Sequence, residues 1–322
     1  MVNEEILFFL KTKPGYISGE EISQALGISR TAIWKHIQEL RELGYDIAAV
    51  PHLGYNLLSC PDRLFPWEIR HVLKNRIIAK SIYYYESLPS TMDKAMEFAL
   101  SGAPEGTLVL AESQTKGRGR MGRQWFSPKY KGIYFSLILR PDMLPQQAPV
   151  LTLIAAVAIC EVLKQYLGIE AQIKWPNDIF SNNKKIAGIL TELRAEMDKI
   201  YAIILGLGIN VNNEKKSLPY PGSSLREITG RPISRLELLQ GILSCFEQRY
   251  REFQKQGVGE ILDKWRHLST TLGKRVRLNT GRSRHQLVGE AVDIDQDGGL
   301  LIRQDSGLVE RVMAGDIIHC KR

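Results

Sequence analysis

The run VLTLIAAVAIC, residues 150–160, restricts the possible folds of this chain more than any other feature of its sequence. A stretch this apolar is unfavourable in water and has to be buried. It is well short of the ~18 apolar residues that a membrane-spanning helix needs. We therefore expect a core helix at residues 148–167, in a chain whose 322 residues suffice for two or three domains.

Composition and charge narrow the class of protein. Hydrophobic and charged contents of 44% and 24% are typical of a globular protein. The formal charge of +8 is uneven: residues 1–60 hold five Lys/Arg and seven Asp/Glu, residues 271–322 hold nine and seven, and the other 29 and 21 lie between them. The positive excess thus belongs to the middle of the chain, where it favours an anionic small ligand.

The four cysteines are widely separated, without a CxxC pair or a histidine at metal-binding spacing. The N-terminal residues lack the order of charged, apolar and small residues found in a secretory signal. We therefore expect a reducing, cytoplasmic compartment, no structural metal and no membrane contact.

The N-terminal part of the chain predicts a winged helix-turn-helix. Ser18-Gly19-Glu20-Glu21 matches a capping box that opens a short helix. Ser29 is a suitable N-cap for a second helix, which Gly44 closes. Residues 45–50 and 55–58 have the composition of two strands around a turn. Helix, turn, helix and hairpin in this order are typical of a DNA-binding domain.

The start of the second helix carries side chains that suit DNA recognition. They lie away from the apolar stripe and are Ser29, Arg30, Thr31, Trp34 and Lys35. Such donors contact phosphates and base edges when the beginning of a recognition helix enters the major groove. The acidic charge of this region leaves an alternative, in which the domain regulates the rest of the chain without binding DNA. With so little positive charge, the module would need dimerisation to gain affinity.

The rest of the chain predicts an α+β protein. Strands are expected at 82–86, 107–111, 132–140, up to 175, 186–193 and 200–205, with a hairpin turn at 182–184, and helices at 91–100, 148–167 and within 234–267. The strands do not alternate regularly with helices, which favours a mixed, mostly antiparallel sheet with helices on one face. Short strands with turns at 280–281 and 297–299 predict a small C-terminal β-barrel. The expected domains are 1–62, 63–270 and 271–322, with a linker at 60–63.

The stretch GRGRMGRQWFSP, residues 117–128, matches neither a helix nor a strand pattern. Its glycines let the backbone approach a ligand closely. Its arginines carry forked donors that match phosphate oxygens, and its tryptophan offers a flat face to a base. The stretch lacks the GxxxxGK[ST] pattern of a P-loop. The residues concerned are Gly117, Arg118, Gly119, Arg120, Gly122, Arg123 and Trp125.

Two further segments have the same chemical character. KWPND, residues 174–178, places a cation, a rigid turn and a carboxylate at the end of a predicted strand. Lys185 precedes an apolar strand and has Gly188 three positions on, which suits a ligand touched by both cation and backbone. A surface lysine beside a hairpin is the alternative. GLGIN, residues 206–210, lacks the third glycine of a dinucleotide-binding motif, and we interpret it as a tight strand end beside a ligand.

These segments resemble the motifs of biotin protein ligases. SLPSTMDKA, ESQTKGRGRMGRQWFSP, KWPND, KKIAGILTEL and GLGIN follow the order of that family, and the winged helix in front is similar to its bifunctional bacterial members, which are also repressors. The resemblance implies a class II synthetase-like central domain and an SH3-like C-terminal barrel. It implies Mg²⁺-dependent formation of biotinyl-5′-AMP from biotin and ATP, then transfer of biotin to a lysine of a biotin carboxyl carrier protein or domain. It also implies a homodimer, promoted by biotinyl-5′-AMP as corepressor, on operator DNA.

The resemblance also implies roles for individual residues. Biotin contacts are expected from Ser90, Thr91, Met92 and Gln114, although many relatives have asparagine in place of Met92. The loop over the adenylate and its phosphates is expected to comprise Gly117, Arg118, Gly119, Arg120 and Arg123, with Trp125 on adenine. Lys174, Lys185, Gly188 and Gly208 are expected to line the site, and Asn177 and Asp178 to lie on the metal or phosphate side. The residues expected to act in catalysis are Lys185, Arg118 and Arg120.

Two alternatives stay open at this point. A repressor that binds biotinyl-5′-AMP without catalysis would belong to a different functional class, but the intact arginines and Lys185 argue against it. Some relatives direct an arginine of the C-terminal domain toward the nucleotide. Arg311 and Arg322 are both available for that position.

Overall fold

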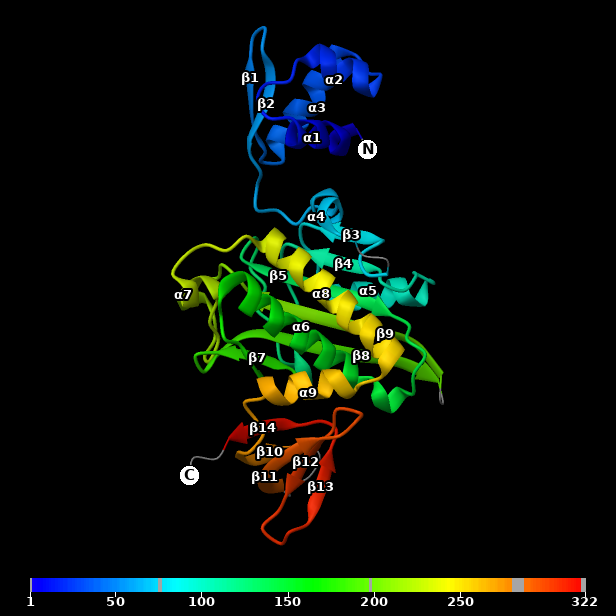
Figure 1. The fold of residues 1–322 in the computed structure, drawn as a ribbon, viewed down its shortest axis with the longest axis vertical. Coiled ribbons are helices and arrows are strands. Elements are labelled where there is room, and N and C mark those ends of the chain that lie inside the picture. Colours follow the sequence, from blue (N-terminus) through cyan, green and yellow to red (C-terminus); the bar gives the residue numbers. More distant parts are fainter. Residues whose placement is uncertain (1, 75–76, 197–198, 280–286, 320–322) are drawn as a thin grey trace. The chain divides into compact units, whose positions relative to one another are not determined.

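The computed structural model describes residues 2–74, 77–196, 199–279 and 287–319 (Figure 1). The chain divides into two compact units, 1–63 and 64–322. The first division follows the expected linker, whereas the C-terminal strands belong to the same compact unit as the central sheet. The domain boundary expected near residue 270 therefore stays a prediction.

The first unit contains three helices and a hairpin. They are α1 (Val2–Thr12), α2 (Gly19–Leu26), α3 (Arg30–Glu42), β1 (Asp46–Val50) and β2 (Gly54–Ser59). Ser18 Oγ accepts a hydrogen bond from the Glu21 backbone N–H at 3.0 Å, and Ser29 Oγ accepts one from the Ala32 N–H at 3.2 Å. These bonds satisfy amide groups that a helix start leaves free, so both predicted N-caps are confirmed.

Helix α1 is absent from the sequence prediction. Its Ile6, Leu7 and Leu10 are buried, and the helix contacts both α2 and α3. The spacing of these three residues is helical and could have indicated the element. Without α1, the apolar stripe of α3 would lose one of its partners, and the remaining two helices and hairpin would enclose less apolar surface.

The second unit is built on a seven-stranded sheet. Its strands are β3 (Ile82–Tyr85), β4 (Leu108–Ala111), β5 (Gly132–Leu139), β6 (Gln172–Lys174), β7 (Asp178–Ser181), β8 (Lys184–Glu196) and β9 (Lys199–Asn210). Their order is β3-β4-β5-β9-β8-β7-β6. Strands β3 and β4 are parallel, and the other neighbours are antiparallel. The predicted mixed, mostly antiparallel sheet is confirmed.

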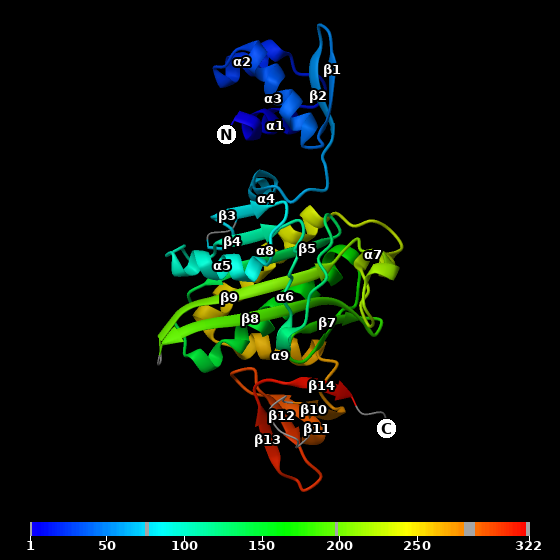
Figure 2. The same cartoon turned by 180° about the vertical axis from the view of Figure 1, so that it is seen from behind.

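Helices cover both faces of this sheet, which corrects the expectation of one covered face. The helices of the unit are α4 (Pro66–Val72), α5 (Thr91–Leu100), α6 (Pro149–Leu167), α7 (Leu225–Thr229), α8 (Arg235–Gln256) and α9 (Gly259–Leu268). Figure 1 shows α6, α8 and α9 on one face, and Figure 2 shows α5 on the other. Every residue of β4 and β5 is buried, so these strands show no polar face. That continuous apolar pattern is the sequence signal for a second helical layer.

Helix α6 contains the apolar run and lies in the core. Its residues from Val150 to Cys160 are all buried. Among the described residues it is the one helix with the length and hydropathy of a membrane span, and 72% of its most apolar window is buried within the protein. Such burial is expected of a core helix, as predicted.

The C-terminal strands form an antiparallel sheet. They are β10 (Arg275–Asn279), β11 (Leu287–Ile294), β12 (Leu300–Arg303), β13 (Val309–Val312) and β14 (Asp316–His319), in the order β13-β12-β11-β10-β14. Within residues 271–279 and 287–319, the pairing leaves β13 and β14 at the two edges, so strand pairing does not close the expected barrel. The turn at 297–299 is confirmed by hydrogen bonds from the Asp297 and Gly299 N–H groups to Asp295 Oδ1. The turn predicted at 280–281 lies outside the described residues.

Trp175 joins the C-terminal sheet to the central sheet. Its side chain is 2% exposed, and its Nε1–H donates to the Gly298 carbonyl oxygen at 3.1 Å. Its backbone N–H donates to Thr271 Oγ1, also at 3.1 Å. The tryptophan of the KWPND segment is therefore a core residue, and it fixes the position of the polar residues on either side of it.

Candidate functional site

One pocket of the second unit collects most of the residues predicted for the site. Its volume is about 480 Å³, and it is bounded by the start of α5, strands β6 to β9 and the segments 117–125 and 218–222. We call residues 117–125 the arginine loop. The predicted residues that line the pocket are Thr91, Met92, Gln114, Arg118, Gly119, Arg120, Arg123, Trp125, Lys174, Asn177, Asp178, Lys185, Gly188 and Gly208.

A polar network lies at the α5 end of the pocket. Gln114 Oε1 accepts hydrogen bonds from Thr91 N at 2.8 Å and Thr91 Oγ1 at 3.1 Å, and Gln114 Nε2 donates to Ser127 Oγ at 2.9 Å. Ser136 Oγ donates to Thr91 Oγ1 at 2.9 Å. Ser90 is not a lining residue, yet it is 2% exposed and its Oγ has no hydrogen-bond partner. An unpaired buried hydroxyl is costly, so this end is suited to a polar ligand group.

Glycines make room for side chains at this end. A Cβ on Gly206 would lie 2.3 Å from Met92 Sδ, so only glycine at 206 accommodates the buried thioether. Met92 therefore offers the pocket an apolar surface, not the hydrogen bonds of an amide. A Cβ on Gly117 would lie 2.4 Å from the Trp125 carbonyl oxygen. Gly117 is thus needed for the close approach of the two ends of the arginine loop, and it does not line the pocket.

The indole of Trp125 lies against the backbone of two paired strands. Gly188 on β8 is in register with Gly208 on β9. A Cβ on Gly208 would lie 2.4 Å from Trp125 Nε1, and one on Gly188 would lie 3.0 Å from the ring. The GLGIN segment forms the last part of β9, which ends at Asn210, so its interpretation as a strand end beside a ligand site agrees with the structure, although the strand is longer than the 200–205 expected. Its glycines provide a flat surface for the indole.

Asn210 is a pocket residue that the sequence analysis missed. It is 4% exposed, lines the pocket, and its Oδ1 has no hydrogen-bond partner. A buried carbonyl oxygen without a partner is an acceptor available to a ligand donor. Asn210 is the last residue of the GLGIN segment, which was interpreted from its glycines alone.

Positive charge gathers on the floor of the pocket. Lys185 Nζ lies 2.6 Å from Asp178 Oδ1 and 5.4 Å from the centre of the Trp125 ring. Burial lowers the pKa of Lys174, and the nearby Lys185 contributes in the same direction against the opposing effect of Asp178. Burial likewise lowers the pKa of the Arg120 guanidinium. Desolvated cations of this kind favour an anionic ligand, which would restore the lost solvation.

The arginine loop is attached to the α5 side of the pocket by Arg118. Its Nη1 donates to Asp93 Oδ1 on α5 at 2.6 Å and to Glu192 Oε2 on β8 at 3.2 Å. Its Nη2 donates to Glu192 Oε1. One guanidinium thus bridges two elements that are distant in sequence.

The opposite side of the arginine loop contacts the C-terminal sheet. Arg120 Nη1 donates to Asn177 Oδ1 and to the Gly315 carbonyl oxygen, both at 3.2 Å. Arg123 Nη2 donates to Asp316 Oδ2 on β14, and Asp316 lines the pocket. Asp316 is a further pocket residue that the sequence analysis missed, since no local pattern marks it.

Of the two C-terminal arginines considered from sequence, Arg311 does not reach the pocket. Arg311 donates to Asp295 Oδ2 and, at 2.6 Å, to Asp297 Oδ2 in the turn before β12. It is not among the residues that line the pocket. Arg322 lies outside the described residues.

The pocket offers few side chains that could coordinate a metal ion. No group of three or more histidine, cysteine, aspartate or glutamate side chains with metal-binding geometry occurs among the described residues. Asp178 contributes one carboxylate, and Asn177 Nδ2 donates to the Ile189 carbonyl oxygen at 2.6 Å, which directs Oδ1 toward Arg120. Mg²⁺ is commonly held by one or two carboxylates together with substrate phosphates. These residues therefore fit a magnesium–nucleotide complex better than a metal ion alone.

The first unit has a groove of its own, with a volume of about 660 Å³, between the start of α3 and the hairpin. Arg30, Thr31 and Trp34 line it, opposite His52 of the hairpin turn. Ser29 and Lys35 are exposed beside it, and Trp34 is 53% exposed. The five residues predicted to contact DNA thus lie on one exposed helix start.

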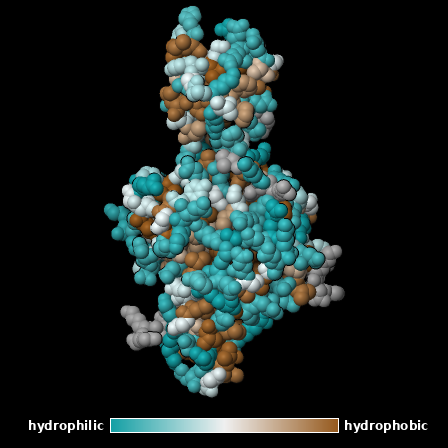
Figure 3. Space-filling view, viewed as in Figure 1, coloured by the Kyte–Doolittle hydropathy of each residue, from teal (hydrophilic) through white to brown (hydrophobic). Residues whose placement is uncertain are grey.

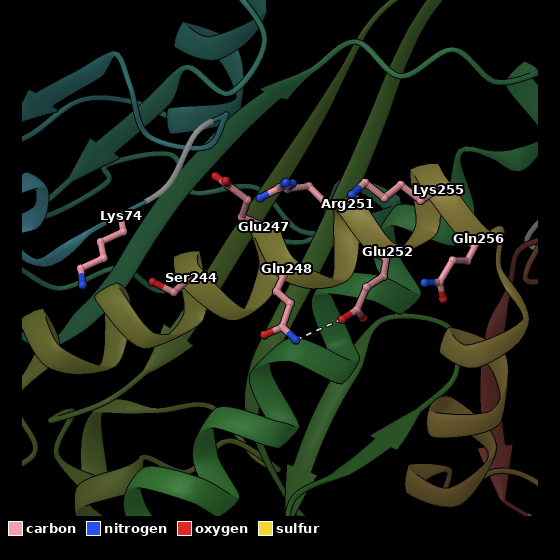
Figure 4. A pocket seen from close by; sticks show the side chains of 8 residues that line it. All are labelled: Lys74, Ser244, Glu247, Gln248, Arg251, Glu252, Lys255 and Gln256. Carbon is pink, nitrogen blue, oxygen red and sulfur yellow. Dashed lines mark hydrogen bonds between the residues drawn. The ribbon is translucent and has the colours of Figure 1, made fainter.

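A further depression of about 490 Å³ runs along α8 (Figure 4). Glu247 accepts hydrogen bonds from the Ile77 and Ile78 N–H groups, and Gln248 Nε2 donates to Glu252 Oε1 at 3.0 Å. This exposed side of α8 is mostly hydrophilic (Figure 3). The carboxylates of the depression hold neighbouring groups of the protein itself, so we assign the ligand site to the pocket beside α5.

Comparisons with known proteins agree with this arrangement. The biotin/lipoate A/B protein ligase family matches residues 84–210, an HTH domain matches residues 3–56, and the biotin protein ligase C terminal domain matches residues 271–320. The bifunctional ligase/repressor BirA of Bacillus subtilis (strain 168) is 44% identical over 306 residues, covering 94% of this chain and 93% of the relative. That of Escherichia coli (strain K12) is 31% identical over 302 residues, covering 93% and 92%.

Solved structures share the fold of the second unit. A biotin protein ligase from Aquifex aeolicus in complex with biotin and ATP matches with a TM-score of 0.64 and 29% identity, over 76% of this chain and 100% of that chain. A biotin protein ligase from Leishmania major in complex with biotinyl-5-AMP matches with a TM-score of 0.51 and 26% identity, over 73% and 99%. Motif order, pocket and full-length similarity lead to one conclusion: the chain belongs to the biotin protein ligase family, among its bifunctional ligase/repressor members.

Proposed function

We propose that the pocket beside α5 binds biotin and ATP, forms biotinyl-5′-AMP, and then transfers biotin to one lysine of a biotin carboxyl carrier protein or domain in the cytoplasm. The observation that carries the proposal is the pairing of Lys185 with Asp178 at 2.6 Å, in a pocket that Lys174 and Arg120 also line. Two anions have to meet in this reaction, and these cations neutralise them.

Biotin occupies the α5 end of the pocket. Its ring carries polar hydrogen-bonding groups beside an apolar thioether ring and chain. The unpaired Ser90 hydroxyl and the Thr91–Gln114 network match the polar part, and the buried Met92 surface matches the apolar part. Its carboxylate then extends toward Lys185.

The nucleotide occupies the space beneath the arginine loop. Trp125 provides a face for adenine, and the unpaired Asn210 Oδ1 accepts a hydrogen bond from its exocyclic amine. Gly119, Arg120 and Arg123 approach the phosphates. The phosphate oxygens then replace Asp316 as the partner of the two arginines. Gly188 and Gly208 let the indole lie close to the strands.

The chemical step is a displacement at phosphorus. A carboxylate oxygen of biotin forms a bond to the α-phosphorus of ATP, and the bond from that phosphorus to the bridging oxygen of pyrophosphate breaks. Lys185 contacts the reacting oxygens, and Lys174 neutralises the charge that develops on pyrophosphate. Asp178, with Asn177, would hold Mg²⁺, which lowers the charge of the phosphates when bound. An acceptor lysine then attacks the acyl carbon, and AMP leaves with the amide formed.

The first unit gives the same chain a second function as a repressor. Arg30, Thr31 and Trp34 face the groove beside the hairpin, and Lys35 is exposed next to them. These side chains enter the major groove of operator DNA, with Ser29 at the helix start. Since residues 1–60 carry more acidic than basic side chains, one copy binds weakly. A homodimer, promoted by biotinyl-5′-AMP as corepressor, supplies the second set of contacts.

The following experiment distinguishes a ligase from a protein that only binds biotinyl-5′-AMP. The protein is incubated with ATP, Mg²⁺, biotin and a carrier domain, and the carrier is analysed by mass spectrometry. A mass increase of one biotin on one lysine supports the proposal. A protein that retains biotinyl-5′-AMP and binds DNA but leaves the carrier unmodified would be a repressor without catalysis.

A further inference from the structure

The contacts of Arg118 differ from those of the other loop arginines. Its partners, Asp93 and Glu192, do not line the pocket, whereas Asp316, the partner of Arg123, does. Arg118 itself lines the pocket, but its two carboxylate partners lie outside the lining. We therefore expect phosphates in the pocket to compete directly with Asp316 for Arg123 and to disturb the Arg118 contacts less.

The two carboxylates come from opposite walls of the same end of the pocket. Asp93 lies in the first turn of α5, next to the lining residue Met92. Gly188 and Leu190 line the pocket, and Glu192 follows them on the same face of β8, because side chains in a strand alternate with a period of two. Arg118 is thus held across the gap between α5 and β8.

The arginine loop depends on such side chains for its attachment. Its backbone closes on itself through hydrogen bonds from Gly119 N to Arg123 O at 2.7 Å and from Trp125 N to Gly117 O at 2.8 Å. Side-chain contacts at Arg118, Arg120 and Arg123 connect the rest of the loop to the pocket walls. If phosphates replace Asp316, the Asp93–Arg118–Glu192 contact is one of two side-chain attachments left, the other being the hydrogen bonds of Arg120 to Asn177 and Gly315.

We propose that Asp93 and Glu192 are positioning residues that fasten the arginine loop through Arg118, and thereby set how long an acyl-adenylate stays bound. This inference depends on the proposed function, since it concerns the retention of biotinyl-5′-AMP. A mixed anhydride is attacked by water and by any amine it meets, so its escape lowers the fidelity of transfer. The three side chains are partly exposed, with 41%, 56% and 28% of the Arg118, Asp93 and Glu192 side chains accessible. The contact can therefore open when an acceptor arrives.

The test measures release of the adenylate. Enzyme loaded with radiolabelled biotinyl-5′-AMP is mixed with excess unlabelled adenylate, and retained label is followed over time. For exposed ion pairs we expect release about threefold faster in Asp93→Asn or Glu192→Gln and roughly tenfold faster in the double variant. Raising salt from about 50 to about 500 mM accelerates release from the wild type but not from the double variant. Glu192→Asp keeps the charge and restores slow release in part.

A matched control is Asp305→Asn. Asp305 accepts two hydrogen bonds from Arg275, at 2.8 and 2.6 Å, in an exposed pair of the C-terminal sheet, and its loss should leave release unchanged. Release within twofold of wild type in all Asp93 and Glu192 variants, with no salt effect, would overturn the inference. Biotin-dependent exchange of pyrophosphate into ATP is measured in parallel. Its absence in the wild type would instead contradict the proposed function. If the double variant does not fold, the release rates of the single variants and the salt dependence of release from the wild type test the inference.

Discussion

The floor of the pocket and the arginine loop above it hold their charges in different ways. On the floor, Lys174, Asp178 and Lys185 project from neighbouring strands that are hydrogen-bonded to one another or to a common partner. In the loop, the arginines form ion pairs with partly exposed carboxylates of α5, β8 and β14. Pairing within a sheet sets positions before a ligand binds, whereas exposed ion pairs are weak and exchangeable. The floor is therefore suited to catalysis, and the loop to capture and release.

Loss of the floor lysine should have the largest effect. We expect Lys185→Ala to slow adenylation by about 100-fold or more, because the lysine meets charge that develops during the reaction. Biotin-dependent pyrophosphate exchange measures this step. The matched control is Lys184→Ala, since Lys184 pairs with Glu227 at 2.8 Å and does not line the pocket. Equal losses in both variants would show that the position of Lys185 in the pocket is unimportant.

Loss of the indole should affect the nucleotide. Stacking on a base contributes ~1–3 kcal/mol, so Trp125→Ala should raise the KM for ATP by roughly 5- to 150-fold and change the KM for biotin far less. Steady-state kinetics with each substrate varied gives both values. Tyr166→Ala, which removes a half-exposed aromatic residue at the end of α6, serves as the control. A larger rise in the KM for biotin would place the indole at the biotin end.

Loss of the loop arginine should separate retention from chemistry. We expect Arg118→Gly to release biotinyl-5′-AMP about tenfold faster or more, because the change removes both carboxylate contacts and adds backbone freedom. Released adenylate then labels lysines of bystander proteins, which mass spectrometry detects. Adenylation should fall much less than in Lys185→Ala. The contrast between floor and loop would be wrong if this variant lost adenylation fully without bystander labelling.

The charge of Lys174 should make the reaction depend on pH. The pKa of Lys174 is lowered mainly by burial, so its charge is lost at a pH below the ordinary lysine value of about 10.4. Above that pKa the neutral amine no longer attracts phosphate, and kcat/KM for ATP should fall on the alkaline side by up to about tenfold. Lys174→Arg keeps its charge and should move this limb to higher pH. An unchanged alkaline limb in that variant would exclude Lys174 as its origin.

A further expected effect concerns self-association. We expect a filled pocket to order the arginine loop, which would remove part of the entropy cost of an interface beside it, so biotinyl-5′-AMP should strengthen dimerisation by roughly 5- to 100-fold. Analytical ultracentrifugation at fixed salt, with and without the adenylate, measures the constant. If it does not change, the ligand acts on DNA binding without shifting the monomer–dimer equilibrium.

The local sequence predicted secondary structure correctly where the conformation of a segment depends mainly on its own residues. The two serine N-caps, the turn at Asn182 and Asn183, whose φ angles are +49° and +59°, and the core helix α6 were all predicted. The residues expected around the pocket also lie there, apart from Ser90 and Gly117, which are not among the lining residues. The loop arginines could be predicted as ligand-binding residues because three guanidinium groups among glycines cannot form part of a hydrophobic core.

The chemical types at the site and the local elements that present them therefore follow from short segments of the sequence. The carboxylates that hold the arginines, the face that α5 covers and the position of the unpaired Asn210 oxygen depend on the packing of distant segments. Arg118 and Glu192 are 74 residues apart, and Arg123 and Asp316 are 193 apart. An aspartate or glutamate in a strand has the same local pattern whether it faces solvent or an arginine. Its partner is chosen by sheet order and helix packing, which depend on the burial of apolar surface across the whole unit.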